Sequence, residues 1–427
     1  MSRDSKVGFS FSELEKHLGS RSFYAVMFNL IILSLFFIQA VRAYVPGVYV
    51  AMFHVVFGHN IVENLFILLT MGFFAVPALT NTICKRIGIK RVLSSSIYIV
   101  AISRLLVAFH LPNIWQTILC GVIVAVYGMF FSTFLTLWIN DASGETTIDN
   151  KAKFLAFSLL TAFLLDYLIR TIGFSQDISL LPPGLIADLW YINQYLWLIV
   201  QIPLTFGCIY FARLHFPRFD SGTDLKVNSK TNRKNTVYSL IFIGMGAFWF
   251  LLFNIFLYPN IIAHYTATSY YINNIIGIAA ILATILIIFR VNTASFVNLT
   301  TSIIQNGIIF VWLLMFLYLS NLLMYIAVVM IAFTVIIFYL NFFVLLSHMA
   351  TVSFKWEKVK TISNTFAIGM VFYILFTVFH ILATDWAYVI SAFKGLGPII
   401  ILLATIVLSF STFMSIKIHY NRGEKDE

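Results

Sequence analysis

Long apolar runs alternate with short polar turns along almost the whole chain. An α-helix needs about 20 apolar residues to cross the hydrocarbon core of a bilayer, and we find twelve runs of roughly that length. They lie near residues 22–41, 61–83, 92–110, 114–138, 152–173, 190–212, 238–258, 271–290, 299–320, 322–346, 361–383 and 397–416. The pattern predicts an all-α polytopic membrane protein of about twelve transmembrane helices.

Lysine and arginine residues gather in alternate connections between these runs. If the amino terminus is cytoplasmic, every one of the 27 falls at a cytoplasmic end except Arg42, Arg104, Arg170 and Lys394. Such a bias predicts that both termini are cytoplasmic. The longest connection on that side follows the sixth run and divides the chain into two six-helix bundles. The predicted domains are a cytoplasmic N-terminal segment (1–21), an N-terminal bundle (22–212), a basic linker (213–237), a C-terminal bundle (238–416) and a cytoplasmic tail (417–427).

Composition excludes a soluble catalytic domain. Hydrophobic residues make up 60% of the chain and charged residues 10%, whereas about a quarter of the residues of a soluble domain are charged. The net charge of +10 comes from short basic runs between apolar segments. This distribution favours membrane lipids with anionic headgroups as partners, and it argues against nucleic acid.

Motifs for metal, cofactor or ATP chemistry are not found. The cysteines Cys84, Cys120 and Cys208 are isolated, the nine histidines lack metal-ligand spacing, and no Walker sequence is present. We therefore expect no metal, no cofactor and no enzymatic activity.

Arg104, Asp166 and Arg170 are charged residues inside apolar runs. An unpaired charge at mid-bilayer costs at least about 2.5–3.5 kcal/mol, so each needs a partner or water. Arg104 and Asp166 lie at similar depth, roughly 18–21 Å from the start of their spans, and Asp166 and Arg170 share a helix face. We expect one cluster of the three residues. It serves either as a structural ion-pair staple or as a substrate or proton site.

Arg42 and Glu63 flank the first outer connection in this scheme. At the ends of spans one and two, their side chains suit the membrane interface better than they suit a substrate-binding pair.

The six-plus-six organisation and one inner turn resemble the major facilitator superfamily. That family has the motif G-x-x-x-D-R-x-G-R-K-R between its second and third helices, and residues 81–91 here read NTICKRIGIKR. The matching residues are Arg86, Gly88, Lys90 and Arg91. Asn81 replaces the first glycine and Lys85 replaces the acid, so an inward gate would be built differently here. The same residues also fit an ordinary positive-inside turn.

The resemblance implies that helices one, four, seven and ten line a central cavity. Candidate lining residues on these helices are Gln39, Tyr127, Trp249, Asn254 and Asn341. Amides and aromatic rings suit a weakly polar or amphipathic solute, although such side chains also hold helices together. The implied function is secondary-active transport of a small organic or amphipathic solute by alternating access, coupled to a proton or sodium ion, in the cell membrane.

A second resemblance is local and leaves another function open. Asp166-x-x-x-Arg170 followed by Asp177 is similar to the membrane domain of the cell-wall and GPI-lipid remodelling family. The alternative function is therefore a lipid or glycolipid flippase or remodelling protein.

Overall fold

The computed structural model describes residues 11–56, 58–109, 113–140, 148–173, 183–217 and 355–389, with single positions at 403, 406 and 407. Every regular element in these residues is a helix. The predicted spans between residues 238 and 346, the last span apart from those three positions, and most of the 213–237 linker lie outside the described residues.

The chain divides into two compact units. One contains Met1–His17, Leu135–Phe157 and Phe219–Glu427; the other, called here the N-terminal unit, contains Leu18–Phe134 and Ser158–Arg218. All the contacts that build the candidate site belong to the N-terminal unit.

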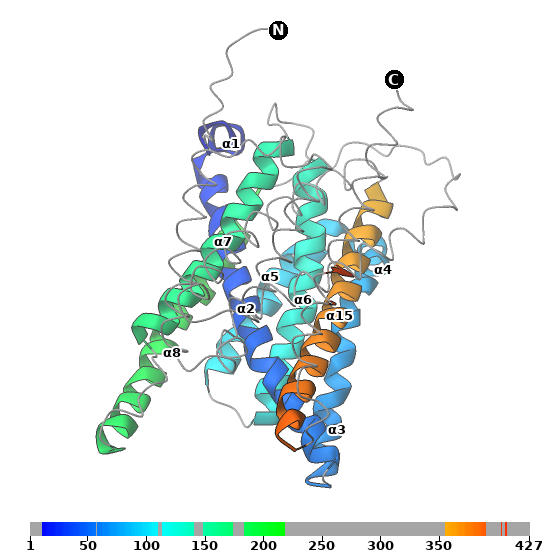
Figure 1. Cartoon of the computed structure of the whole chain (residues 1–427). Helices are drawn as coiled ribbons and strands as arrows, with labels where there is room; N and C mark the ends of the chain where they lie inside the picture. The colour runs from blue at the N-terminus through cyan, green and yellow to red at the C-terminus, as the bar shows by residue number, and fades with distance from the viewer. Residues whose placement is uncertain are drawn as a thin grey trace. The chain divides into compact units, whose positions relative to one another are not determined.

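Figure 1 labels most of the helices of the described residues. They are α1 (Phe11–Leu18), α2 (Ser20–Val56), α3 (Ile61–Leu69), the 3-10 helix η1 (Thr70–Leu79), α4 (Thr80–Ile87), α5 (Ile89–Ala108), α6 (Asn113–Asn140), α7 (Ile148–Gly173), α8 (Pro183–Leu214) and α15 (Lys355–Val389). Among the described residues, four stretches are long and apolar enough to cross a membrane: Ser20–Val55, Ile61–Ile87, Ile89–Ala108 and Ile114–Trp138.

Helix α2 is much longer than the predicted first span. The sequence places an end at Val41, before Arg42 and the Pro-Gly pair at 46–47, whereas the helix continues to Val56. Arg42 therefore lies inside a helix rather than at its end. The helix packs closely against α6 at Gly47. A Cβ added at Gly47 would lie 3.0 Å from the Thr117 Oγ1 atom.

The second predicted span is not a uniform α-helix. Between α3 and α4 the chain adopts ten residues of 3-10 helix, η1, which contains Pro77. Proline has no N–H and its ring clashes with the preceding turn, so a regular α-helix is interrupted there. Threonine hydroxyls accompany the change at both ends of η1, where Thr70 donates to the Ile67 carbonyl and Thr80 donates to the Pro77 carbonyl.

Glycine ends α4 and starts the next helix. Gly88 has φ 90°, in the left-handed region that glycine adopts without a steric penalty, and its N–H donates to the Cys84 carbonyl. The turn between α4 and α5 thus falls at the glycine of the sequence motif.

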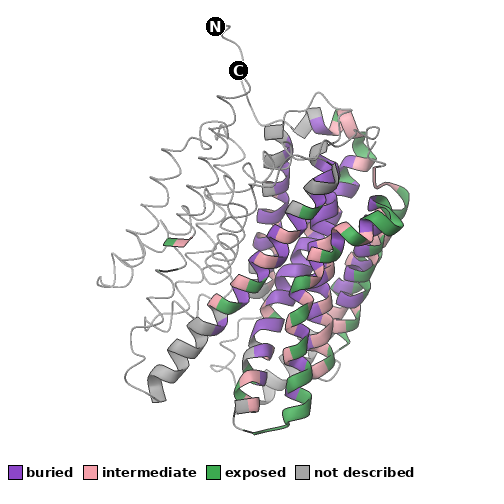
Figure 2. Cartoon of the chain, turned by 90° about the vertical axis from the view of Figure 1, so that its right-hand side faces the viewer, coloured by how far each residue is buried: buried purple, intermediate pink, exposed green. Residues whose placement is uncertain are grey.

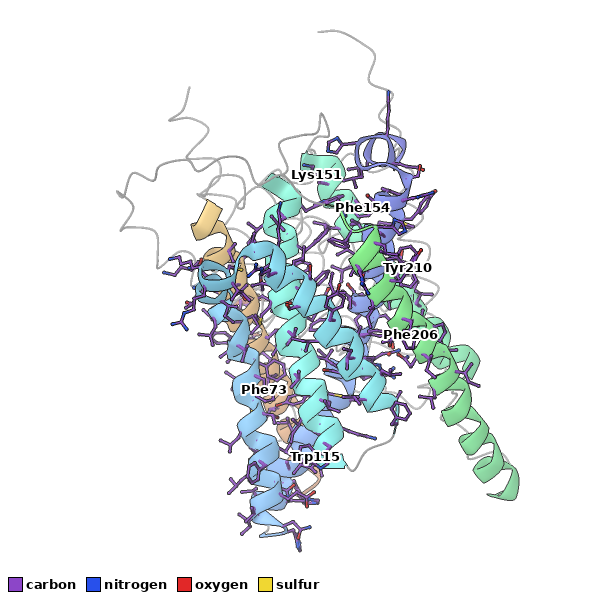
Figure 3. The ribbon with its side chains drawn as sticks, turned by 180° about the vertical axis from the view of Figure 1, so that it is seen from behind. Phe73, Trp115, Lys151, Phe154, Phe206 and Tyr210 are labelled. Carbon is purple, nitrogen blue, oxygen red and sulfur yellow. The ribbon has the colours of Figure 1, made fainter. Side chains whose placement is uncertain are left out.

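Small residues let the helices of the N-terminal unit approach closely. α2 contacts α3, α5 and α8, and α5 packs along α8. A Cβ at Gly207 would lie 2.8 Å from the Phe28 Cζ atom, and one at Gly121 would lie 2.9 Å from the Phe73 Cδ2 atom. Buried residues occupy the sides of the helices that face one another, and exposed apolar residues occupy the outer sides (Figure 2). Phe206 and Tyr210 mark such an outer side on α8 (Figure 3).

Candidate functional site

An ion pair joins α2 to α7 inside the N-terminal unit. The Arg42 Nη1 atom lies 3.5 Å from the Asp166 Oδ2 atom. The Asp166 side chain is completely buried, whereas 31% of the Arg42 side chain is exposed. The pair therefore has one wholly enclosed partner and one that reaches the surface of the unit.

Arg104 of α5 brings a second guanidinium to this place. Its charge interacts with those of Arg42 and Asp166 and with the thiol of Cys120 on α6. Arg104 and Cys120 are both buried. Four helices thus contribute to one charged centre, called here the ion-pair cluster: Arg42, Arg104, Cys120 and Asp166. Arg170 lies on the next turn of α7, and its side chain is outside the described part of the structure.

Sequence reasoning did not include Arg42 in this cluster. The prediction paired Asp166 with Arg104 and Arg170 and assigned Arg42 to the membrane interface. An available signal was the apolar character of residues 43–56, which contain no charged side chain after Arg42. Extending the first helix through them would have placed Arg42 within a span, where a charge requires a partner.

A buried charge is tolerated in a protein interior when a charge of opposite sign lies beside it. Removing one partner leaves an uncompensated charge in a low-dielectric interior, so the carboxylate of Asp166 offsets the charge of its partner Arg42. A guanidinium also offers a planar fork of donors that matches a carboxylate or another oxyanion. The cluster can therefore stabilise the bundle, bind a charged group, or do both.

A second group of buried residues lies between α2 and α6. The hydroxyls of Ser34 and Tyr127 are hydrogen-bonded at 2.8 Å, and the rings of Phe37 and Tyr127 stack with centroids 4.3 Å apart and an interplanar angle of 16°. The Phe131 ring also stacks on the Tyr127 ring. We call Ser34, Phe37, Tyr127 and Phe131 the aromatic wall. It supplies flat apolar surface with two hydroxyls.

Three buried amides have hydrogen-bonding capacity to spare. Within the described ranges, the Oδ1 atom of Asn29, the Oε1 atom of Gln39 and both amide atoms of Gln201 have no hydrogen-bond partner. Gln39 is 5% exposed, and Asn29 and Gln201 are completely buried. An unpaired buried polar group costs about 1–3 kcal/mol, so these atoms are suited to meet a ligand or water.

Known proteins are similar to this chain in structure rather than in sequence. No protein-family model matches the sequence, and no curated protein matches it. Among solved structures, a variant of the Escherichia coli fucose:proton symporter FucP superposes with a TM-score of 0.59 at 13% identity, covering 92% of this chain and 98% of that one. The human organic anion transporter MFSD10 superposes with a TM-score of 0.60 at 10% identity, covering 93% and 99%. The proton:xylose symporter XylE gives 0.59 at 10% identity, covering 93% and 96%.

The chain has the major facilitator fold. The likeness extends over both halves of the solved transporters, and the fold with its apolar helices makes this an integral membrane protein. The named neighbours are transporters, and none of these three is an enzyme by its name.

The residues predicted for the central cavity and for the gating loop fall in three groups. Gln39 and Tyr127 are buried in α2 and α6. Trp249, Asn254 and Asn341 lie outside the described residues. The residues predicted for the gating loop, Arg86, Gly88, Lys90 and Arg91, are exposed at the turn between α4 and α5. Across the described ranges no group of three or more His, Cys, Asp or Glu residues is placed to hold a metal ion.

Proposed function

We propose that this protein is a secondary-active transporter that moves a small organic or amphipathic solute across the cell membrane by alternating access. The observation that carries the proposal is the major facilitator fold over more than nine-tenths of the chain. Proteins of this architecture bind solutes near the bilayer midplane between two bundles that rock around the site. The proposal includes twelve transmembrane helices in two bundles, with both termini cytoplasmic.

The buried chemistry of the N-terminal unit supports a solute site. The aromatic wall supplies flat apolar surface, and Gln39, two residues after it on α2, has an acceptor oxygen available. Ligand sites combine such apolar surface with a few placed polar groups. The apolar rings of the wall also suit a lipid tail. The experiment below therefore tests the flippase or lipid-remodelling alternative as well.

Coupling to an ion is part of the proposal. Two of the neighbours, FucP and XylE, are named as proton symporters. Asp166 is a completely buried carboxylate in the N-terminal unit, and charged residues inside a membrane protein often mark an ion pathway. We propose a proton or a sodium ion as the coupling ion.

Uptake into proteoliposomes tests the proposal directly. The purified full chain is reconstituted and supplied with labelled sugars, amino acids, organic anions, organic cations or fluorescent lipids, with an imposed proton or sodium gradient. Accumulation of a soluble solute that collapses when the gradient is dissipated would support coupled transport. Movement of lipid between leaflets with no solute uptake would favour the flippase alternative instead.

A variant pair ties the uptake to the aromatic wall. Tyr127→Ala removes the ring that stacks on Phe37, whereas Tyr127→Phe keeps the ring and removes only the hydroxyl. We expect Tyr127→Ala to raise the KM for the solute at least about tenfold, because about 1.4 kcal/mol of contact energy corresponds to that factor. Equal KM values for Tyr127→Ala and the wild type would exclude the wall from the solute site.

A further inference from the structure

Two histidine rings lie side by side at the connection between α2 and α3. His54 is in the last turn of α2, and His59 comes two residues before α3 begins at Ile61. Their rings lie edge to face, with centroids 6.1 Å apart and an interplanar angle of 79°. Residues five apart do not share a face of a helix, so the spacing in the sequence did not pair them. The rings meet because α2 ends between the two residues.

Hydrogen bonds hold this connection in a defined shape. The His59 N–H donates to the His54 carbonyl at 2.8 Å. The side-chain amide of Asn64 donates to the carbonyls of His59 and Asn60, at 2.9 and 3.0 Å. Gly58 and Asn60 both have positive φ, a conformation that glycine and asparagine adopt more readily than other residues. The two imidazoles are therefore presented by a fixed turn.

The nitrogen atoms of both rings are available to a ligand. Within the described ranges, every hydrogen bond of His54 and His59 uses a backbone atom. His59 is exposed and His54 is half-buried. The pair lies where two stretches able to cross a membrane meet, Ser20–Val55 and Ile61–Ile87. An ion in the water beside the membrane can therefore reach the two rings.

We propose that His54 and His59 together bind one divalent transition-metal ion of the zinc and copper class. A zinc ion bonds an imidazole nitrogen at about 2.0–2.1 Å, so two rings that share one ion have their centres about 5–6.5 Å apart. The separation of 6.1 Å falls in this range. Rotation about the Cβ–Cγ bond of histidine is soft, so each ring can direct one nitrogen at a common point without a change in the backbone.

The chemistry of the ligands selects the ion. Imidazole suits zinc, copper and nickel, whereas calcium and magnesium prefer oxygen ligands. No third His, Cys, Asp or Glu joins the pair in the part of the chain that the structure describes, so water fills the remaining coordination positions. Cu²⁺ should bind more tightly than Zn²⁺, as it does at most sites with nitrogen ligands. A bound ion would tie the end of α2 to the start of α3, and this inference does not rest on the proposed transport function.

Metal titration of the purified full-length protein tests the site. The protein carries no histidine tag, is stripped of metal with EDTA and is then titrated with zinc, copper, magnesium or calcium chloride. Neutral pH is used because a histidine binds metal only when its imidazole is neutral. A ligand of the folded state raises the unfolding temperature, and competition with a coloured chelator gives the apparent Kd. We expect zinc and copper to stabilise the protein and magnesium and calcium to leave it unchanged.

Single substitutions locate the bound ion. His54→Ala and His59→Ala should each raise the apparent Kd for zinc at least about tenfold, because each removes one of the two protein ligands. His59 is exposed, so its variant is expected to fold normally. His215→Ala is the matched control, since His215 is half-buried like His54 and its ring packs against Tyr210. This variant should keep the wild-type Kd.

Electron paramagnetic resonance of the copper-loaded protein counts the ligands independently of stability. The signal of Cu²⁺ carries splittings from the nitrogens bonded to it. We expect the coupling of two imidazoles in the wild type and of one imidazole in either single variant. The coupling of two imidazoles in both single variants would overturn the assignment.

The titrations decide between a shared site and a general metal effect. Zinc stabilisation that both His54→Ala and His59→Ala weaken, and that His215→Ala retains, supports the site. Equal zinc affinity in the wild type and in the double variant overturns it, because the ion then binds elsewhere in the chain. Equal stabilisation by zinc and magnesium overturns it as well, since divalent charge alone would explain the effect. A zinc site in a protein that takes up no solute would retain this inference and reject the proposed transport function.

Discussion

At the scale of single residues, the burial of Asp166 against two arginines has the largest energetic consequence. Asp166→Asn removes the negative charge that offsets the positive charges of Arg42 and Arg104. Breaking a buried ion pair from one side costs about 3–5 kcal/mol, and the partial exposure of Arg42 places the expected loss near the lower limit, about 3 kcal/mol. Thermal unfolding of the purified protein measures it.

The control for this change is an acid of the same unit that is exposed. Glu63→Gln should change the free energy of unfolding by less than about 0.5 kcal/mol, as surface substitutions usually do. The double variant Asp166→Asn with Arg42→Gln removes one charge of each sign and should be more stable than Asp166→Asn alone. If the double variant is the less stable of the two, the pair does not stabilise the fold.

The hydroxyl pair of the aromatic wall permits a second residue-scale prediction. Tyr127→Phe and Ser34→Ala each remove one side of a 2.8 Å buried hydrogen bond. Each should cost about 1–2 kcal/mol, because the remaining hydroxyl stays buried. The double variant should cost less than the sum of the two, and additive losses in a double-mutant cycle would show that the hydroxyls do not interact.

At the scale of helices, close approach between α2 and α8 depends on Gly207. A Cβ there would lie 2.8 Å from the Phe28 Cζ atom, too close for an ordinary contact. Gly207→Ala should destabilise the protein by about 1–3 kcal/mol through overpacking, and adding Phe28→Leu should recover part of the loss. Gly72→Ala in η1 is the control, since nothing lies within 4 Å of its Cβ. An equal loss in both alanine variants would contradict the packing explanation.

Sequence patterns predict helices well where apolar runs end at polar turns. The runs 92–110 and 114–138 correspond closely to α5 and α6, because Gly88 and the Pro112-Asn113 pair bound them. The prediction fails for α2, where a charge and a Pro-Gly pair normally end a helix. Inside α2, Arg42 pairs with Asp166 and Gly47 packs against Thr117, and both of these residues are distant in sequence. The Arg42–Asp166 pair was not predicted because the predicted first span ended before Arg42.

At the scale of the whole molecule, the three cysteines share one property. Cys84, Cys120 and Cys208 are the complete set in the sequence, and all three are buried. A thiol reagent reacts with an accessible thiolate, so the folded protein should react little with a membrane-impermeant maleimide. Labelling before and after denaturation measures this difference, and full labelling of the folded protein would contradict it.

This burial of the native thiols makes it practical to measure conformational change in the protein by cysteine labelling. Single cysteines can be introduced into the natural sequence without first replacing the native three. Glu63→Cys at the start of α3, where the native side chain is exposed, should label readily and give the reference signal. Cysteines placed one at a time along α2 from residue 42 onward would then report, by their labelling rates with and without solute, which positions water reaches in each state of the proposed transport cycle.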